Sequence, residues 1–162
     1  MERKPTLCLD FDGVIHSYTS GWKGAKKIPD SIVSGALDFI TKAMQEFTVA
    51  IYSSRSGQYG GIRAMKTWLR KRMKEVATLQ VSTPPELKKF VFTYGVGPCT
   101  LVIKSSDWDR AVDKASYCLI HFIEWPKFKP PAKISLDDRA ICFKGIFPSV
   151  EELLSFKTWQ ER

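Results

Sequence analysis

The chain has 162 residues, of which 44% are hydrophobic and 12% aromatic, enough to bury the core of one compact domain. Its formal net charge of +8 favours partners that carry phosphate, although many small proteins without such partners are also basic. No apolar run approaches the roughly 18 to 20 residues that span a bilayer, and Asp10 interrupts the first run before a signal peptide could form. We therefore expect a single cytoplasmic domain over residues 1–162, with no membrane partner.

Cysteine usage argues against a structural zinc site. The chain has four cysteines and no C-x-x-C pair. Most of these cysteines lie inside apolar stretches, where the side chain behaves as a small hydrophobic group.

The first predicted strand ends in two carboxylates. Residues 6–11, TLCLDF, are short and apolar, as in a buried strand, and Gly13 ends the run. Asp10 and Asp12 therefore lie at the carboxyl end of this strand. Residues 14–29 mix aromatic side chains, glycines and lysines in no sustained period, which predicts a loop or a small hairpin flap.

The next part of the chain repeats a helix and a strand. Asp30 or Ser31 is expected to cap a helix that runs to about Glu46, because apolar residues recur there at helical spacing. Residues 47–54, FTVAIYSS, predict a second buried strand, and a turn then leads into a helix over about residues 58–74. This alternation predicts a Rossmann-like α/β fold, a parallel sheet with helices on both faces.

The remainder of the chain is less regular. Between residues 75 and 125 we expect a turn at Pro84-Pro85, a strand at 100–104, a helix at 107–117 and a strand at 118–125. Residues 132–140, AKISLDDRA, predict a strand that ends in paired carboxylates, and residues 148–159 predict a terminal helix after Pro148.

Polar side chains are expected to gather at one edge of the sheet. Ligands of parallel sheets bind outside the carboxyl ends of the strands, where Asp10, Asp12, Ser53 and the pair Asp137-Asp138 all fall. Carboxylates from two strands suit Mg²⁺, which prefers oxygen ligands. Asp10 is the candidate nucleophile, and Asp12 projects to the same side, where it is placed to act as general acid and base.

These residues carry a resemblance to a known family. DFDGVIHSY, the strand ending in Ser53, Lys129 with Pro130, and LDDRA resemble the four ordered motifs of the haloacid dehalogenase (HAD) superfamily of phosphohydrolases. The string K-P-x-A-x-x-x-x-D-D-R-A is similar to that of small members encoded by phages and prophages. The short stretch between Asp12 and Ser53 leaves no room for a large cap, whereas the longer one before Lys129 leaves room for a small insert at about 75–125.

The resemblance implies a role for each matching residue. Asp10 would be phosphorylated, and Asp12 would act as acid and base while its backbone carbonyl contacts the metal. Ser53 would hydrogen-bond the phosphoryl oxygens, and Lys129 would hold the nucleophile and the phosphate. Asp137 and Asp138 would complete the Mg²⁺ site, in an order that is left open. Because the second aspartate, Asp12, is present, the family pattern favours phosphoester hydrolysis.

The roles of several basic and polar residues have more than one interpretation. Lys127 and Lys133 are alternatives to Lys129. Ser54 is either a substrate contact or a helix cap, and Arg55 and Arg139 are either substrate-phosphate ligands or surface ion-pair partners. Arg55 and Arg139 both lie beside candidate catalytic residues.

The flap and the second helix point toward nucleotides. His16 and Trp22 lie in the flap among lysines, a pattern that can stack a base and hold its phosphate, although an ordinary loop fits as well. His121 lies in an apolar run and is expected to be a core or strand-face histidine. The helix at 58–74 is strongly basic and would contact a nucleic-acid backbone through charge alone.

Taken together, these features predict a Mg²⁺-dependent phosphatase that works through a phospho-aspartate. Its expected substrate is a nucleotide or the 3′-phosphate end of a polynucleotide, with a sugar or other metabolite phosphate as the alternative. A chain without activity that binds nucleic acid through its basic helix is the alternative from another class.

The flap hypothesis makes a prediction of its own. Replacing Trp22 with alanine should raise KM for nucleotides more than KM for a small generic phosphoester, because only the nucleotide offers a base to stack. Steady-state kinetics on both substrates measure the difference. Equal changes in the two KM values would rule the hypothesis out.

Overall fold

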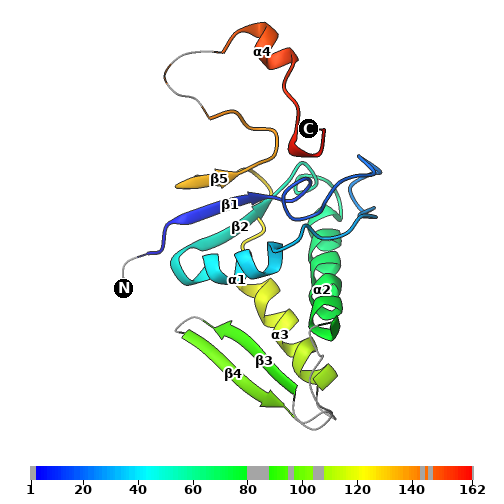
Figure 1. The fold of residues 1–162 in the computed structure, drawn as a ribbon, viewed down its shortest axis with the longest axis vertical. Helices are drawn as coiled ribbons and strands as arrows, with labels where there is room; N and C mark the ends of the chain where they lie inside the picture. Colours follow the sequence, from blue (N-terminus) through cyan, green and yellow to red (C-terminus); the bar gives the residue numbers. More distant parts are fainter. Residues whose placement is uncertain are drawn as a thin grey trace.

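The computed structural model describes residues 3–79, 88–94, 97–103, 108–142, 145 and 148–161. In chain order, the elements are β1 (Thr6–Asp10), α1 (Ala36–Glu46), β2 (Thr48–Tyr52), α2 (Gly61–Leu79), β3 (Lys88–Tyr94), β4 (Gly97–Ile103), α3 (Trp108–Phe122), β5 (Ile134–Leu136), α4 (Val150–Leu154) and a 3-10 turn (Trp159–Glu161). Strands β1, β2 and β5 form one sheet with helices beside it (Figure 1). The predicted α/β class is confirmed at this level.

The sheet has β1 in its centre. Its order is β2-β1-β5, and both neighbours run parallel to β1. Cys8 pairs with Ala50 on one side and with Ser135 on the other, so the three strands are in matching register. Parallel strands end at the same edge, so the polar residues that follow β1, β2 and β5 are brought together there.

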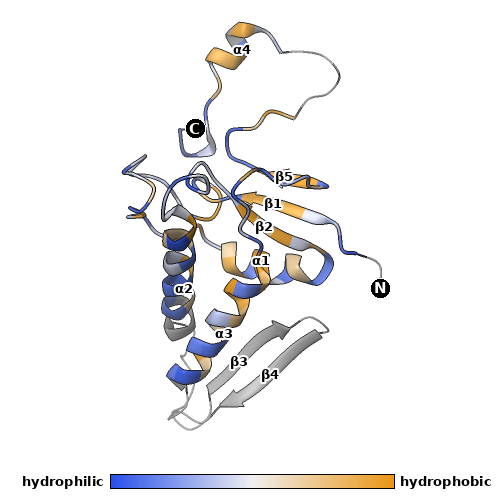
Figure 2. Ribbon diagram, turned by 180° about the vertical axis from the view of Figure 1, so that it is seen from behind, coloured by the Kyte–Doolittle hydropathy of each residue, from blue (hydrophilic) through white to orange (hydrophobic). Residues whose placement is uncertain are grey.

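The core forms where the helices meet the sheet. Leu7, Leu9, Val49 and Ile51 alternate with polar or small residues along β1 and β2, and each is 4% exposed or less. Helices α1, α2 and α3 add the buried side chains that join them in one cluster: Ile40, Met65, Trp68, Leu69, Leu119 and Ile120. Burial of each large apolar side chain stabilises the fold by roughly 1.5–3 kcal/mol. Figure 2 shows hydrophobic residues along β1 and β2 and many hydrophilic residues along α2.

Helix α1 begins later than the sequence predicts. The expected cap was Asp30 or Ser31, but the helix starts at Ala36, after Gly35 in a left-handed conformation with φ of 79°. The preceding residues are held by the flap instead, since Ser17 N donates to Ser31 O (2.9 Å) and Val33 N donates to Ile15 O (2.8 Å). Pairing with the flap therefore competes with helix formation in this segment.

The strand predicted at 118–125 is wrong. Helix α3 continues to Phe122, and Leu119, Ile120 and Ile123 turn their side chains into the core at helical spacing. A short apolar run does not distinguish a buried strand from a buried helix. Only Glu124 pairs with the sheet, through hydrogen bonds with Val49 and Ile51 of 2.9 Å each.

The C-terminal elements are shorter than predicted. The strand expected over 132–140 is limited to Ile134–Leu136, and its three residues are exposed. The helix expected over 148–159 is divided into α4 and the 3-10 turn. The flap at 14–29 contains no regular strand and pairs only through isolated bridges at His16.

Part of the predicted insert is described. Strands β3 and β4 form an antiparallel hairpin, which includes most of the strand predicted at 100–104. The turn predicted at Pro84-Pro85 lies outside the described residues, and the role of the insert as a cap stays a prediction. Among the helices of the described ranges, none is both long and apolar enough to cross a membrane.

Candidate active site

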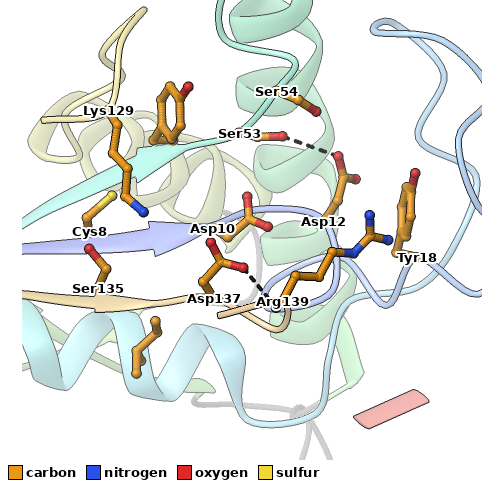
Figure 3. Close-up of a pocket in the computed structure, with 12 residues that line it drawn as sticks. Cys8, Asp10, Asp12, Tyr18, Ser53, Ser54, Lys129, Ser135, Asp137 and Arg139 are labelled. Carbon is orange, nitrogen blue, oxygen red and sulfur yellow. Dashed lines mark hydrogen bonds between the residues drawn. The ribbon is translucent and has the colours of Figure 1, made fainter. Parts of the chain in front are cut away.

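A pocket of about 300 Å³ opens at the edge where β1, β2 and β5 end (Figure 3). Most of the predicted site residues line it. Those residues are Asp10, Asp12, Ser53, Ser54, Lys129, Asp137 and Arg139. Among the candidate lysines, Lys129 lines the pocket, whereas Lys127 and Lys133 do not.

Other residues that line the pocket were not predicted from the sequence. Cys8, Tyr18, Tyr52, Ser135 and Leu136 complete its lining. A signal for three of them was present, because Cys8 precedes Asp10 by two residues in an extended strand and so shares its side. Tyr52 and Ser135 then pair with Asp10 and Cys8 across the sheet.

Three carboxylates meet beside this pocket. Asp10, Asp137 and Asp138 each offer an oxygen, and these oxygens lie within 4.8 Å of one another. The side chain of Asp138 is 1% exposed, and neither of its oxygens has a hydrogen-bond partner among the described residues. Arg139 Nε lies 3.8 Å from Asp138 Oδ2, an ion pair without a hydrogen bond. A buried carboxylate without hydrogen bonds is costly, so this arrangement fits a bound cation.

The pKa values of Asp10 and Asp138 are raised, as expected for crowded carboxyls that are at least partly buried. Burial raises the pKa of Asp10 to about 7, and the charges of Asp137, Asp12 and Asp138 add to the rise. The hydrogen bond from Phe11 N, at 2.7 Å, opposes it. Burial also raises the pKa of Asp138. A divalent cation would favour the ionised form of both groups.

Because Gly13 has no side chain, Asp138 can lie close to the loop that follows β1. Gly13 has φ of 93°, and a Cβ placed there would lie 2.3 Å from Asp138 Oδ2. Any other residue would therefore push the carboxylate out of its position. The glycine after the aspartates is needed for close packing as well as for the turn.

Asp12 is held differently from the other aspartates. Arg55 donates to both carboxylate oxygens, from Nε to Oδ2 (2.7 Å) and from Nη2 to Oδ1 (3.0 Å). His16 Nδ1 lies 2.9 Å from Oδ1, and Ser53 Oγ donates to Oδ2 over 3.3 Å. Burial raises the pKa of Asp12, but the hydrogen bonds and charges of His16 and Arg55 outweigh it and hold the pKa below its usual value.

Arg55 lies behind Asp12 and does not line the pocket. Its side chain is fully buried, and Nη1 donates to the backbone carbonyls of Gly24, Ala25 and Lys27 at 2.7, 3.1 and 3.1 Å. Trp22 stacks on its guanidinium, 4.6 Å from the ring centroid. Arg55 therefore joins the flap to Asp12, and the structure does not bring Arg55 or Trp22 to the candidate phosphate site.

The two histidines take places that the sequence did not indicate. His16 is fully buried, and its Nε2 accepts a hydrogen bond from Asp30 N over 3.2 Å while Nδ1 faces Asp12. His121 was expected in the core or on a strand, but it lies exposed on α3 with Nδ1 2.8 Å from Tyr117 O.

The basic side of α2 is partly paired within the protein. Arg70 and Lys74 both bind Asp113 of α3, and Arg72 binds Glu75. These ion pairs reduce the charge available to a nucleic acid. Ser54 is exposed at the pocket and does not cap α2, which begins at Gly61.

No protein-family model matches the chain, and no match was found among the curated proteins or the solved structures. The chemistry of the site is therefore argued from its own residues. The carboxylates of the site differ in their surroundings. Asp12 accepts hydrogen bonds on both oxygens and has a lowered pKa. Burial raises the pKa values of Asp10 and Asp138.

The contribution of the ion pair between Asp12 and Arg55 can be tested by measuring the free energy of unfolding of variants. Arg55→Met should lower the free energy of unfolding by about 3–5 kcal/mol, because it leaves a buried carboxylate without its partner. The double variant Arg55→Met/Asp12→Asn should recover part of this loss.

The matched control is Lys42→Met, which removes the exposed pair with Asp38 and should cost less than about 1 kcal/mol. Urea unfolding measures all of these variants. A loss at Arg55 no larger than the loss at Lys42 would contradict the coupling described above.

Proposed function

We propose that the protein is a Mg²⁺-dependent phosphomonoester hydrolase that works through a phosphorylated Asp10. The observation that carries this proposal is the meeting of Asp10, Asp137 and Asp138, in which both oxygens of Asp138 are buried without a hydrogen-bond partner among the described residues. Hard oxygen ligands of this kind suit Mg²⁺. The adjoining pocket has the space and the cation, Lys129, that a phosphoryl group needs.

The strand order supports a HAD-like fold. In the proposed fold, β1 carries the nucleophile and lies between the strand that ends in Ser53 and the strand that ends in Asp137, as the observed order β2-β1-β5 allows. Helices would cover both faces of this Rossmann-like sheet. The motif resemblance of the sequence and this order point to the same chemistry, although fold alone does not assign a function.

Each site residue has a task in the proposed reaction. Asp10, Asp137 and Asp138 would hold Mg²⁺, together with the backbone carbonyl of Asp12. The bound ion would supply positive charge for the phosphoryl oxygens and lower the pKa of Asp10. Lys129 and Ser53 line the same pocket and would bind the remaining phosphoryl oxygens.

The reaction has two displacements at phosphorus. In the first, an Asp10 oxygen bonds to phosphorus, the bond to the leaving oxygen breaks, and that oxygen gains a proton. In the second, water attacks phosphorus, Asp12 takes its proton, and the bond to Asp10 breaks. The lowered pKa of Asp12 keeps its carboxylate ionised, the form that accepts the proton of water in the second step. Asp12 must first gain a proton before it can give one to the leaving oxygen in the first step.

The binding-module alternative has weaker support. It depends on the basic side of α2, where Arg70, Arg72 and Lys74 already have acidic partners. It also does not explain why the buried oxygens of Asp138 have no hydrogen-bond partner among the described residues. Nucleotides, polynucleotide 3′ ends and metabolite phosphates remain the substrate classes proposed for the enzyme.

Phosphate release tests the proposal directly. The purified protein should release phosphate from members of a panel of p-nitrophenyl phosphate, nucleotides, phosphorylated oligonucleotides and sugar phosphates, with Mg²⁺ and not with EDTA. Asp10→Asn should reduce the rate by about a thousandfold or more, because it removes the nucleophile.

Asp38→Asn, an exposed change on α1, is the matched control and should retain the activity. Metal-independent release, or equal rates for Asp10→Asn and wild type, would contradict the proposal. Absence of release from the whole panel would favour the binding module.

A further inference from the structure

A second pocket adjoins the candidate active site. It has a volume of about 700 Å³, and it shares two wall residues, Tyr18 and Arg139, with the 300 Å³ pocket. The rest of its wall comes from the flap and from the C-terminal segment 156–161: Thr19, Gly21, Phe156, Thr158, Gln160 and Glu161. A substrate bound at Asp10 would meet this space as it extends past the shared wall.

The C-terminal wall is fixed to the catalytic loop. Trp159 Nε1 donates to Gly13 O over 2.7 Å, and Gln160 Nε2 donates to Ser17 O. Within the segment, Glu161 Oε2 accepts hydrogen bonds from Thr158 N (2.9 Å) and Thr158 Oγ1 (3.0 Å). The segment thus folds against the loop that carries Asp12, although it is far away in the sequence.

Tyr18 is held in an unfavourable conformation at the shared wall. Its φ of 57° is in the left-handed region, which a tyrosine rarely adopts. Its ring lies edge-on to His16 at 5.9 Å, and the Arg139 guanidinium lies 5.4 Å from the ring centroid. An aromatic ring and a cation therefore lie in the wall that the two pockets share, and Figure 3 shows Tyr18 and Arg139 next to each other in the first pocket.

We propose that the second pocket is a leaving-group subsite that takes the nucleoside of a nucleotide or of a polynucleotide end. This inference rests on the proposed function, because it assumes that the phosphoryl group lies beside Asp10. The smaller pocket, of about 300 Å³, has room for a phosphoryl group, and the adjoining volume of about 700 Å³ has room for a nucleoside.

The lining of the subsite suits a nucleoside chemically. Tyr18 and Phe156 offer aromatic surfaces on which a base can stack, and the side chains of Thr19 and Gln160 offer polar groups for a sugar or base edge. Arg139 is charged and exposed, so it can attract a further phosphate of a longer substrate. No base-specific contact is needed for binding of this kind.

Equilibrium binding to the Asp10→Asn protein tests the subsite without turnover. The probes are thymidine 3′-monophosphate, thymidine 5′-monophosphate and inorganic phosphate, each in Mg²⁺. Thr19→Trp places a bulky ring in the second pocket from an exposed loop position. It should weaken nucleotide binding relative to phosphate binding by about tenfold, which corresponds to about 1.4 kcal/mol.

Phe156→Ala should also weaken nucleotide binding relative to phosphate binding, because it removes a stacking surface without filling the pocket. Gln45→Trp, an exposed change on α1, should leave the ratio unaltered. Thermal unfolding checks that each variant is folded. An unaltered ratio in folded Thr19→Trp and Phe156→Ala proteins, or no preference of the parent for nucleotide over phosphate, would overturn the subsite. The proposed hydrolase activity would fail separately, in the phosphate-release experiment.

Discussion

The ion pair between Asp12 and Arg55 determines how the candidate site is built. Arg55 is fully buried and uses its guanidinium to bind Asp12 on one side and the carbonyls of the flap on the other. Removing a charged pair from water is costly, and the cost is offset only when the remaining donors and acceptors are satisfied. The flap, the end of β2 and the loop after β1 therefore form one arrangement, with His16 and Ser53 completing the contacts of Asp12.

The aspartates of the site differ in whether the protein itself supplies a positive charge to balance them. Asp12 has its cation within the protein, whereas Asp10, Asp137 and Asp138 repel one another at the end of the sheet. Burial and this repulsion raise the pKa of Asp10 to about 7, so the cluster is more stable when a cation is bound. In our account, the first set positions the catalytic loop and the second set binds Mg²⁺ beside the pocket.

The sequence predicts which residues lie at the carboxyl ends of the strands better than it predicts how the flap and the C-terminal segment fold around them. Apolar runs at 6–11 and 47–54 predicted parallel strands, and strand ends then brought Asp10, Ser53 and Asp137 together as expected. The partners of Arg55 and the place of His16 depend on how the irregular flap folds, which no periodicity reveals. The wall formed by segment 156–161 depends on a long-range contact for the same reason. In α3, an apolar run fitted helix and strand equally well.

The central claim is that Asp138 is a ligand of a divalent cation, and Mg²⁺-dependent thermal unfolding tests it most directly. Mg²⁺ at about 100 times its Kd should raise the Tm of the wild type by about 5 to 10 °C. Asp138→Asn should lose most of this rise, while Asp113→Asn, an acidic residue outside the cluster, should keep it. A similar rise in the wild type and Asp138→Asn, or no rise in the wild type, would contradict the account.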